Sequence, residues 1–295
     1  MKSPLTIGTR GSDLALKQAD ITKRALLRAE PALEIEIQII KTEGDTNQSP
    51  IPLDVVGKGW FTKEIEQALL GGAIDIATHS LKDLPESLSP GLHIGAYLER
   101  EDARDVLVSN NNRILDALPR GAVIGTDSLR RKVQILALRS DLVVVSIRGN
   151  VPTRIQKLAS GDYDALVLAS AGLKRLGMED TITQYFEVGD MTPAPGQGTL
   201  ALETKVGGAE LQKLLTAIQD TDAAEASNIE RSYSLAMGGG CKSPTGAYAF
   251  REGDQWVLLG MRADSSMRIV REEMRAPLGE SAQLGEMLAK KLLGN

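Results

Sequence analysis

Two stretches of the chain that lie far apart in sequence resemble each other, and this repeat constrains the fold more than any other feature. Ile7-Gly8-Thr9-Arg10-Gly11-Ser12 resembles Ile124-Gly125-Thr126-Asp127-Ser128. The stretch 75–83 resembles, with a small gap, the stretch 164–175. The repeat predicts two similar α/β domains with a cleft between them, where strand ends and helix N-termini face a ligand.

Each of the two rounds alternates strand-like and helix-like segments. In the first round we expect strands over 6–9, 34–39 and 74–78, and helices over 12–29 and 62–70. In the second round we expect strands over 122–126, 142–147 and 165–169, with helices that begin at Ser128 and Pro152. A loop rich in Gly, Pro and polar residues fills about 43–59, and a loop of this length is usually functional or mobile.

The chain from about residue 221 follows a different pattern. We expect a helix over 222–235, strands over 246–250, 255–261 and 267–270, and a closing helix over 281–293. This order predicts a small α+β domain.

Composition excludes several classes of protein. The 295 residues contain 34 Lys and Arg against 39 Asp and Glu, and a net charge of −5 does not suit general nucleic-acid binding. We expect no membrane span, and the N-terminus lacks the apolar run of a signal peptide, so we expect a cytoplasmic protein. One cysteine excludes an internal disulfide, and two histidines, His79 and His93, are too few for a Cys/His zinc site, so we expect no metal.

The single cysteine, Cys241, follows three glycines and precedes Pro244. A lone cysteine is most often a small buried apolar residue, but the glycines favour an open loop. A thiol on such a loop can be a nucleophile or an attachment point. The spacing alone does not decide between these roles.

Six arginines follow predicted strands at the points where each strand gives way to a loop or helix. In a doubly wound α/β domain, these points line the ligand cleft. Guanidinium groups there suit a ligand with several carboxylate or phosphate groups, because the planar fork binds such groups through two hydrogen bonds. These residues are Arg10, Arg130, Arg131, Arg148, Arg154 and Arg175. Each could also be a solvated surface charge. Ser12, Thr126 and Ser128 would add hydroxyl and helix-terminal N–H donors.

Asp83 lies in the segment His79-Ser80-Leu81-Lys82-Asp83. It could form a surface ion pair with Lys82, or it could hold a cationic reaction centre and exchange a proton. Gly196-Gln197-Gly198 follows two prolines, and we interpret it as a hinge or crossover.

Taken together, these segments resemble the porphobilinogen deaminase family over nearly the whole chain. The resemblance rests on many motifs in order: Gly8-Thr9-Arg10-Gly11-Ser12, Gly57-Lys58-Gly59-Trp60-Phe61, His79-Ser80-Leu81-Lys82-Asp83, Arg100-Glu101-Asp102, Ser128-Leu129-Arg130-Arg131, Arg148-Gly149-Asn150, Ala171-Gly172-Leu173-Lys174-Arg175, Pro195-Gly196-Gln197-Gly198 and Gly239-Gly240-Cys241.

The resemblance implies two α/β domains of the periplasmic-binding-protein type (type II) around a central cleft, and a small C-terminal α+β domain. The implied bounds are 1–98 with about 197–218 for the first domain, 99–196 for the second and 219–295 for the third. We expect a monomer.

The resemblance also implies the chemistry. A dipyrromethane cofactor would be bound to Cys241 by a thioether, and four porphobilinogen units would be coupled to it with loss of ammonia. Hydrolysis would then release hydroxymethylbilane. Asp83 would act as the acid/base at the pyrrole nitrogens, and the loop with Lys58 and Phe61 would cover the site. The ligand carboxylates would be held by Arg10, Ser12, Lys82, Thr126, Ser128, Arg130, Arg131, Arg148, Arg154 and Arg175.

Three positions depart from the family pattern. Asp13 stands where proline is frequent, Asp54 replaces a common lysine, and Lys242-Ser243 follows Cys241 where other pairs are usual. None removes a proposed catalytic group.

Two other functions fit parts of the sequence. A non-enzymatic two-domain binding protein for a small anion would use the cleft and the arginines, but it would leave Cys241 and Asp83 without a role. A cysteine hydrolase would need Cys241 and His79 within hydrogen-bond reach.

Overall fold

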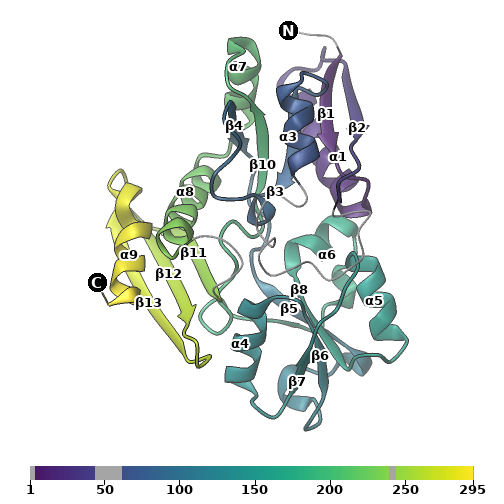
Figure 1. Cartoon of the computed structure of the whole chain (residues 1–295), viewed down its shortest axis with the longest axis vertical. Coiled ribbons are helices and arrows are strands. Elements are labelled where there is room, and N and C mark those ends of the chain that lie inside the picture. The colour runs from purple at the N-terminus through teal and green to yellow at the C-terminus, as the bar shows by residue number, and fades with distance from the viewer. Residues whose placement is uncertain (1–3, 44–61, 239–243, 295) are drawn as a thin grey trace. The chain divides into compact units, whose positions relative to one another are not determined.

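The computed structural model describes residues 4–43, 62–238 and 244–294, and these divide into two compact units. Unit 1 consists of residues 1–100 and 199–227, and unit 2 consists of residues 101–198 and 228–295. Figure 1 shows the elements of both units along the chain. The sequence boundaries near 98 and 197 lie within two residues of those of unit 1, while the division into three domains stays a prediction.

Unit 1 contains one sheet that is five-stranded in the described residues, with the order β2-β1-β3-β10-β4. Its strands are β1 (Leu5–Thr9), β2 (Ile35–Ile39), β3 (Ile76–Ser80), β4 (Leu92–Tyr97) and β10 (Leu200–Lys205). Strand β1 is parallel to β2 and β3, whereas β10 returns antiparallel between β3 and β4.

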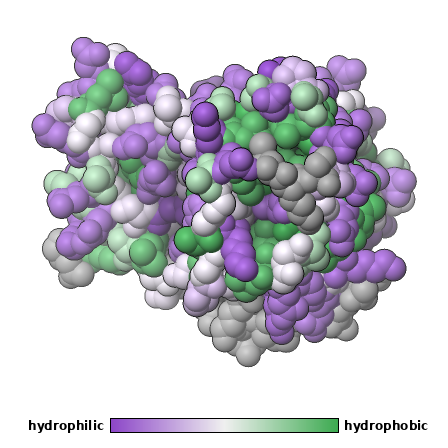
Figure 2. All heavy atoms as spheres, turned by 90° about the horizontal axis from the view of Figure 1, so that it is seen from above, coloured by the Kyte–Doolittle hydropathy of each residue, from purple (hydrophilic) through white to green (hydrophobic). Residues whose placement is uncertain are grey.

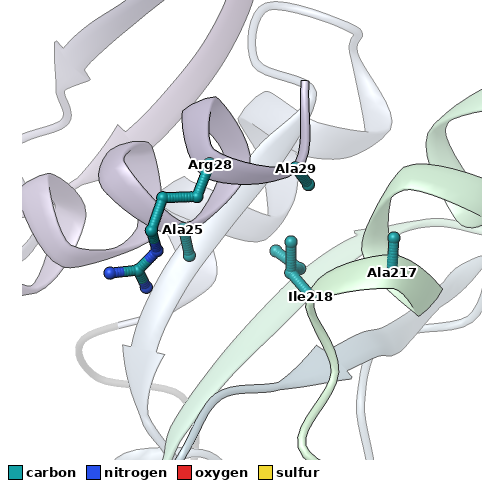
Figure 3. A pocket seen from close by; sticks show the side chains of 5 residues that line it. All are labelled: Ala25, Arg28, Ala29, Ala217 and Ile218. Carbon is teal, nitrogen blue, oxygen red and sulfur yellow. The ribbon is translucent and has the colours of Figure 1, made fainter. Parts of the chain in front are cut away.

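Helices cover both faces of this sheet. Helix α1 (Asp13–Ala29) and helix α7 (Ala209–Ile218) pack on one face through Leu26 and Leu215. Helix α3 (Lys63–Leu70) packs on the other face through Ile65 and Leu69. A hollow of about 310 Å³ is lined by the C-terminal ends of α1 and α7, and Arg28 is one of its lining residues (Figure 3).

Unit 2 contains a second sheet of five described strands, with the order β7-β6-β8-β5-β9. Its strands are β5 (Asp105–Ser109), β6 (Val123–Gly125), β7 (Val143–Val145), β8 (Ala165–Ala169) and β9 (Gln184–Tyr185). Its helices are α4 (Leu129–Leu138), α5 (Val151–Ala159) and α6 (Ser170–Leu176). Ile135 of α4 packs on one face of the sheet, and Leu158 of α5 and Leu173 of α6 pack on the other.

The two sheets share one topology. In each sheet one strand pairs in parallel with two neighbours: β1 with β2 and β3, and β6 with β7 and β8. A further strand then pairs antiparallel with the second neighbour: β10 with β3, and β5 with β8. The resembling aspartates also make the same contacts. Asp75 accepts a hydrogen bond from Thr6 N at 2.8 Å, and Asp164 accepts one from Val123 N at 2.7 Å. The repeat seen in the sequence is therefore a repeat of the fold.

The C-terminal part of unit 2 forms a three-stranded antiparallel sheet in the described residues, with helices packed on it. Its elements are β11 (Thr245–Glu252), β12 (Gln255–Ala263), β13 (Ile269–Pro277) and α9 (Leu284–Leu293), together with residues 228–236 of α8 (Thr221–Ala236), whose first residues belong to unit 1. The helices approach β12 closely, because a Cβ on Gly260 would lie 2.7 Å from Leu288 Cδ2 and 3.0 Å from Tyr233 Cε2.

Most of the expected elements are confirmed, and most of them shift by one or two residues at their ends. The expected strand over 267–270 is longer, because β13 runs to Pro277, and the closing helix begins with a 3-10 turn (Ser281–Gln283) before α9. The expected strand over 74–78 begins two residues later, at Ile76. Strands β4, β5 and β10 were not expected from the sequence. Of the expected loop over 43–59, only Glu43 lies within the described residues.

The surface of the described part of the chain mixes polar and apolar side chains. Figure 2 shows hydrophobic areas separated by hydrophilic side chains on the face that it draws. Among the described residues, no helix is long and apolar enough to cross a membrane.

Candidate functional site

The predicted site residues of unit 1 lie at the ends of β1 and β3. Arg10 follows β1 directly, and Ser12 caps α1 by accepting a hydrogen bond from Ala15 N at 3.3 Å. Asp13 is the first residue of α1, where a negative charge is favourable because it faces the positive end of the helix dipole. This placement gives a physical reason for an aspartate at position 13.

Lys82 and Asp83 lie in a short 3-10 turn (Leu81–Asp83) directly after β3. Leu81 and Leu84 on either side are buried, and Leu81 N donates to Thr199 O at 3.0 Å. Asp83 itself is exposed. The turn thus anchors its two leucines in the core and leaves the carboxylate of Asp83 accessible.

The predicted site residues of unit 2 lie at the equivalent strand ends. Thr126 follows β6, and its Oγ1 accepts a hydrogen bond from Ser128 N at 3.2 Å. Ser128 caps α4 by accepting from Arg131 N, as Ser12 does in unit 1. Arg148 is exposed between β7 and α5, and Arg154 in the first turn of α5 donates from Nε to Gly149 O at 2.8 Å.

Arg175 lies in α6 and is mostly withdrawn from solvent. Its Nη2 donates to Gly198 O, and burial lowers the pKa of Arg175 to about 10, although nearby Glu101 opposes this shift. Its neighbour Lys174 pairs with Glu101 at 3.0 Å. These contacts lie within unit 2, and they tie α6 to the segment that precedes β5.

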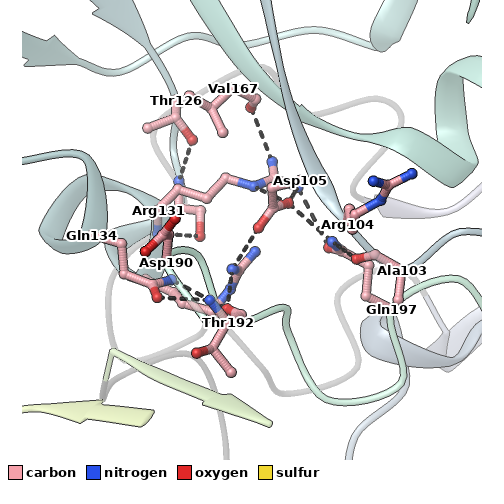
Figure 4. A network of polar contacts seen from close by, with 12 residues as sticks. Ala103, Arg104, Asp105, Thr126, Arg131, Gln134, Val167, Asp190, Thr192 and Gln197 are labelled. Carbon is pink, nitrogen blue, oxygen red and sulfur yellow. Dashed lines mark hydrogen bonds and ion pairs between the residues drawn. The ribbon is translucent and has the colours of Figure 1, made fainter. Parts of the chain in front are cut away.

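Arg130 and Arg131 are buried in the first turn of α4, and both bind the carboxylate of Asp105. Arg130 Nη1 lies 2.6 Å from Asp105 Oδ2. Arg131 Nε lies 2.9 Å from Asp105 Oδ1 (Figure 4). Gln197 Nε2 also donates to Asp105 Oδ1 at 2.9 Å. The side chain of Gln197 is therefore part of a buried polar network, and the interpretation of 196–198 as a hinge stays a prediction.

This network has a clear electrostatic consequence. Burial alone would raise the pKa of Asp105, but the two guanidinium groups outweigh burial and hold the pKa well below its usual value. Burial lowers the pKa of Arg130, and Asp105 opposes this change. One carboxylate balances only one of the two guanidinium groups, so the cluster of Asp105, Arg130 and Arg131 keeps one net positive charge.

Sequence reasoning identified the two arginines but not Asp105. The available signal was a charged residue directly before the apolar run Val106-Leu107-Val108, because an aspartate at the head of a buried strand needs a partner. Gln134 and Thr192 also belong to this network and were not anticipated. Gln134 Oε1 accepts from Thr192 N at 2.8 Å, and Arg130 Nη1 donates to Thr192 O at 2.6 Å.

Several predicted residues lie outside the described part of the chain. They are Asp54, Lys58, Phe61, Cys241, Lys242 and Ser243. His79 is described: its Nε2 lies 3.0 Å from Glu203 Oε2 inside unit 1, so this histidine is already engaged by a buried carboxylate. No group of three or more His, Cys, Asp or Glu residues that could hold a metal ion occurs among the residues that the structure describes.

The repeated sheet and the cationic side chains at its strand ends define a mixed α/β protein built from two related units and a small C-terminal sheet. The model of the porphobilinogen deaminase dipyromethane cofactor binding domain matches residues 5–213, and that of the porphobilinogen deaminase C-terminal domain matches residues 224–294. The chain belongs to the porphobilinogen deaminase family and carries its dipyrromethane cofactor-binding domain.

Curated relatives agree over almost the full length. A porphobilinogen deaminase of Roseiflexus castenholzii is 44% identical over 294 residues, which cover 99% of this chain and 97% of the relative. A porphobilinogen deaminase of Roseiflexus sp. (strain RS-1) is 45% identical over the same coverage. Among solved structures, the periplasmic VFT2 domain of Bordetella pertussis BvgS matches with a TM-score of 0.43 and 15% identity over 72% of this chain and 86% of that chain.

The described residues fit a ligand with several carboxylate groups. The unbalanced positive charge at Asp105, Arg130 and Arg131 favours an anion, and Arg130 makes side-chain hydrogen bonds to described residues through Nη1 alone. Its Nε and Nη2 groups therefore have donors left for a ligand. The fit supports the cofactor that the family domain implies.

Proposed function

We propose that the chain is a hydroxymethylbilane synthase, a transferase that couples four porphobilinogen molecules head to tail with loss of four ammonia molecules. One water molecule is consumed when hydroxymethylbilane is released. The family match over both domains supports this proposal, and the observation in the structure that supports it best is the set of hydroxyl and cationic groups at equivalent strand ends of both units.

The cofactor, when bound through a thioether to Sγ of Cys241, supplies a pyrrole end that accepts the next unit and stays attached while the chain grows. Holding one reactant in place lowers the entropic part of the barrier to each coupling. The side chains of the protein bind the carboxylate groups and transfer protons.

Arginines, together with Lys82 and the hydroxyl groups of Ser12, Thr126 and Ser128, bind the acetate and propionate groups. Charge-assisted hydrogen bonds of this kind contribute about 1.5–3 kcal/mol each, so several hold a polyanion firmly. Arg10 and Arg148 follow strand ends, and Arg130 and Arg154 lie in the first turns of α4 and α5. Because Nη groups of Arg131 and Arg175 already donate to backbone carbonyls of their own unit, we assign these two arginines a supporting part.

Asp83 is the catalytic acid/base. Its exposed carboxylate, on a turn that buried leucines hold in place, can accept hydrogen bonds from pyrrole N–H groups and stabilise positive charge on the reacting unit. We further propose that the protein acts as a cytoplasmic monomer, with Lys58 and Phe61 in a loop over the site.

The test is the intact mass of the denatured, purified protein beside a Cys241→Ser control. We expect additional mass equal to two linked pyrrole units, and we expect that mass to be absent from the control. If the bare chain is found, apoprotein is incubated with porphobilinogen or hydroxymethylbilane and weighed again. A chain that still gains no mass is not this enzyme.

The same measurement separates the proposal from an anion-binding protein without chemistry. Such a protein would bind porphobilinogen reversibly, and its mass after denaturation would equal that of the bare chain. A Cys241-dependent gain in mass excludes this alternative.

A further inference from the structure

Register pairing makes the two sheets comparable residue by residue. Gly8 pairs with Ala77 in β3, and Gly125 pairs with Leu166 in β8, so these two pairs are equivalent. Three residues further on, at the ends of β3 and β8, Ser80 is therefore equivalent to Ala169. Because Leu200 pairs with Ser80 and Asp105 pairs with Ala169, Leu200 and Asp105 occupy the same position of the fold.

The helix caps extend this comparison to the two arginines. Ser12 accepts from Ala15 N and Ser128 accepts from Arg131 N, so Ala15 and Arg131 are equivalent. The residues before them, Leu14 and Arg130, are then equivalent as well. Where unit 1 has Leu14, Ala15 and Leu200, unit 2 has Arg130, Arg131 and Asp105.

This difference shows that the fold does not need charges at these positions. Leu200 is 1% exposed in the apolar core of unit 1, whereas Asp105 is 0% exposed among guanidinium and amide groups. A buried ion cluster of this kind is weak evidence for stability, because desolvation of the charges offsets most of their attraction. The charges in unit 2 therefore need an explanation other than folding.

Arg130 and Arg131 differ in which of their side-chain donors bond to the protein. Arg131 donates from Nε to Asp105, from Nη1 to Val167 O at 3.1 Å and from Nη2 to Gln197 Oε1 at 3.4 Å. Arg130 uses Nη1 alone, towards Asp105 and Thr192 O, and its Nε and Nη2 donate to no residue within 4–43, 62–238 and 244–294. All three side-chain nitrogens of Arg131 thus donate to the protein. In Arg130 only Nη1 does so among the described residues, and Nε and Nη2 can still donate to a ligand.

We propose that Asp105 is a positioning residue of the cofactor site: together with Arg131 it holds the guanidinium of Arg130 so that Nε and Nη2 meet a carboxylate of the dipyrromethane. This inference rests on the proposed function. It assigns to Asp105 no direct contact with the cofactor. Its effect passes through the orientation of Arg130 and through the charge balance of the cluster.

Two variants test this role. Asp105→Asn keeps the shape of the side chain and removes its charge. The double variant Asp105→Leu with Arg131→Ala copies Leu200 and Ala15 of unit 1, and it keeps both Arg130 and the net charge of the cluster at +1. Asp141→Asn is the matched control, because Asp141 binds Arg139 at 2.8 Å at the other end of α4, away from every predicted site residue.

Apoprotein of each variant is incubated with increasing concentrations of hydroxymethylbilane, and the rate of mass gain gives a half-saturating concentration and a maximal rate. Thermal melting of the same apoprotein reports the fold independently of loading. We expect the double variant to fold but to melt below the wild type, because apolar residues already serve at two of these positions in unit 1 while the guanidinium of Arg130 stays buried without its counter-charge. We expect its half-saturating concentration to rise at least about tenfold, because Arg130 has lost the partners that orient it. The Asp105→Asn variant should show the same rise, and Asp141→Asn should show none.

Three results would overturn the inference. They are a double variant that melts and loads like the wild type, a double variant that does not fold, and a control that loads as poorly as the Asp105 variants. A wild-type apoprotein that gains no mass would instead count against the proposed function itself. The two failures are therefore distinguishable.

Discussion

The two repeated sheets agree in backbone and differ in where they bury charge. Unit 2 buries Asp105, Arg130 and Arg131 where unit 1 has Leu200, Leu14 and Ala15. Unit 1 in turn buries the pair His79 and Glu203, whose equivalents by register in unit 2 are Leu168 and Val108. Each unit thus shows that the other could fold without its buried charges.

The difference also separates the chemistry of the two units. Unit 1 carries an exposed aspartate, Asp83, on the turn after β3, whereas unit 2 has Gly172 three residues after the end of β8. Unit 2 carries instead the cluster with net positive charge. In the proposed function, the carboxylate for the reacting centre therefore comes from one copy of the fold, and the buried guanidinium cluster comes from the other.

The largest effect is expected from Asp83→Asn. Turnover should fall by about 10²-fold or more, because the amide can neither transfer a proton nor stabilise a cation as a carboxylate does. Melting temperature should not change, since the side chain is exposed. Steady-state kinetics and thermal melting check both statements. Asp180→Asn, an exposed aspartate of unit 2, is the control, and near-normal turnover of Asp83→Asn would remove its assigned role.

Asp105→Leu alone should destabilise the chain strongly at neutral pH. It leaves two guanidinium groups buried without a counter-charge, which costs about 3–5 kcal/mol in the free energy of unfolding. Replacing all three residues (Asp105→Leu, Arg130→Leu, Arg131→Ala) should recover most of that loss. Denaturant unfolding measures both, and a triple variant less stable than the single variant would contradict the comparison of the two units.

The pH dependence of this loss has a definite sign. The folded-state pKa of Asp105 lies below that of the unfolded chain, so its contribution is complete above the ordinary carboxyl pKa of about 3.9 and is lost as the pH falls towards the folded value. The difference in unfolding free energy between wild type and Asp105→Asn should therefore shrink as the pH is lowered below about 4. A difference that grows in acid would refute this interpretation of the cluster.

Adding a methyl group to either repeated glycine should have an intermediate effect. A Cβ on Gly8 would lie 2.2 Å from Ile74 Cδ1, and a Cβ on Gly125 would lie 2.7 Å from Leu166 Cδ2. Overpacking of this kind costs about 1–3 kcal/mol. Gly8→Ala and Gly125→Ala should both lower the unfolding free energy in denaturant, whereas Gly189→Ala, at an open position without a positive φ, should not. Equal behaviour of the two glycines supports the repeat.

The smallest effect is expected from the exchange of His79 and Glu203 for their equivalents, Leu and Val. The pair is buried, with Glu203 at 0% exposure, and an apolar pair of similar position already packs in unit 2. We expect a change within about 1 kcal/mol in the free energy of unfolding, because removing both partners leaves no unpaired charge. Glu203→Val alone is the comparison, and a large loss in the double variant would mean that unit 1 depends on this pair.

Sequence by itself determined the local structure and the repeat. Ser12 and Ser128 predict the starts of α1 and α4, because a serine hydroxyl before an apolar periodic run accepts a hydrogen bond from a backbone N–H group in the first turn of the helix. The strand over 165–169 was predicted with its exact ends, since a short apolar run between turn residues is a local signal. The ordered motifs also identified the family, which the comparisons confirm over both domains.

Only the tertiary structure decided which strands lie together and which charges are buried. Strand β10 lies between β3 and β4, although more than a hundred residues separate it from either, and no local pattern encodes that pairing. The sequence placed Arg130 and Arg131 alike at a strand exit. The packing of β5 against β8 brings Asp105 to them. The hydrogen bonds then engage Arg131 through Nε, Nη1 and Nη2, but they engage Arg130 through Nη1 alone among the described residues. The fold selects partners this distant in sequence, because a buried charge or polar group without a hydrogen-bond partner is costly.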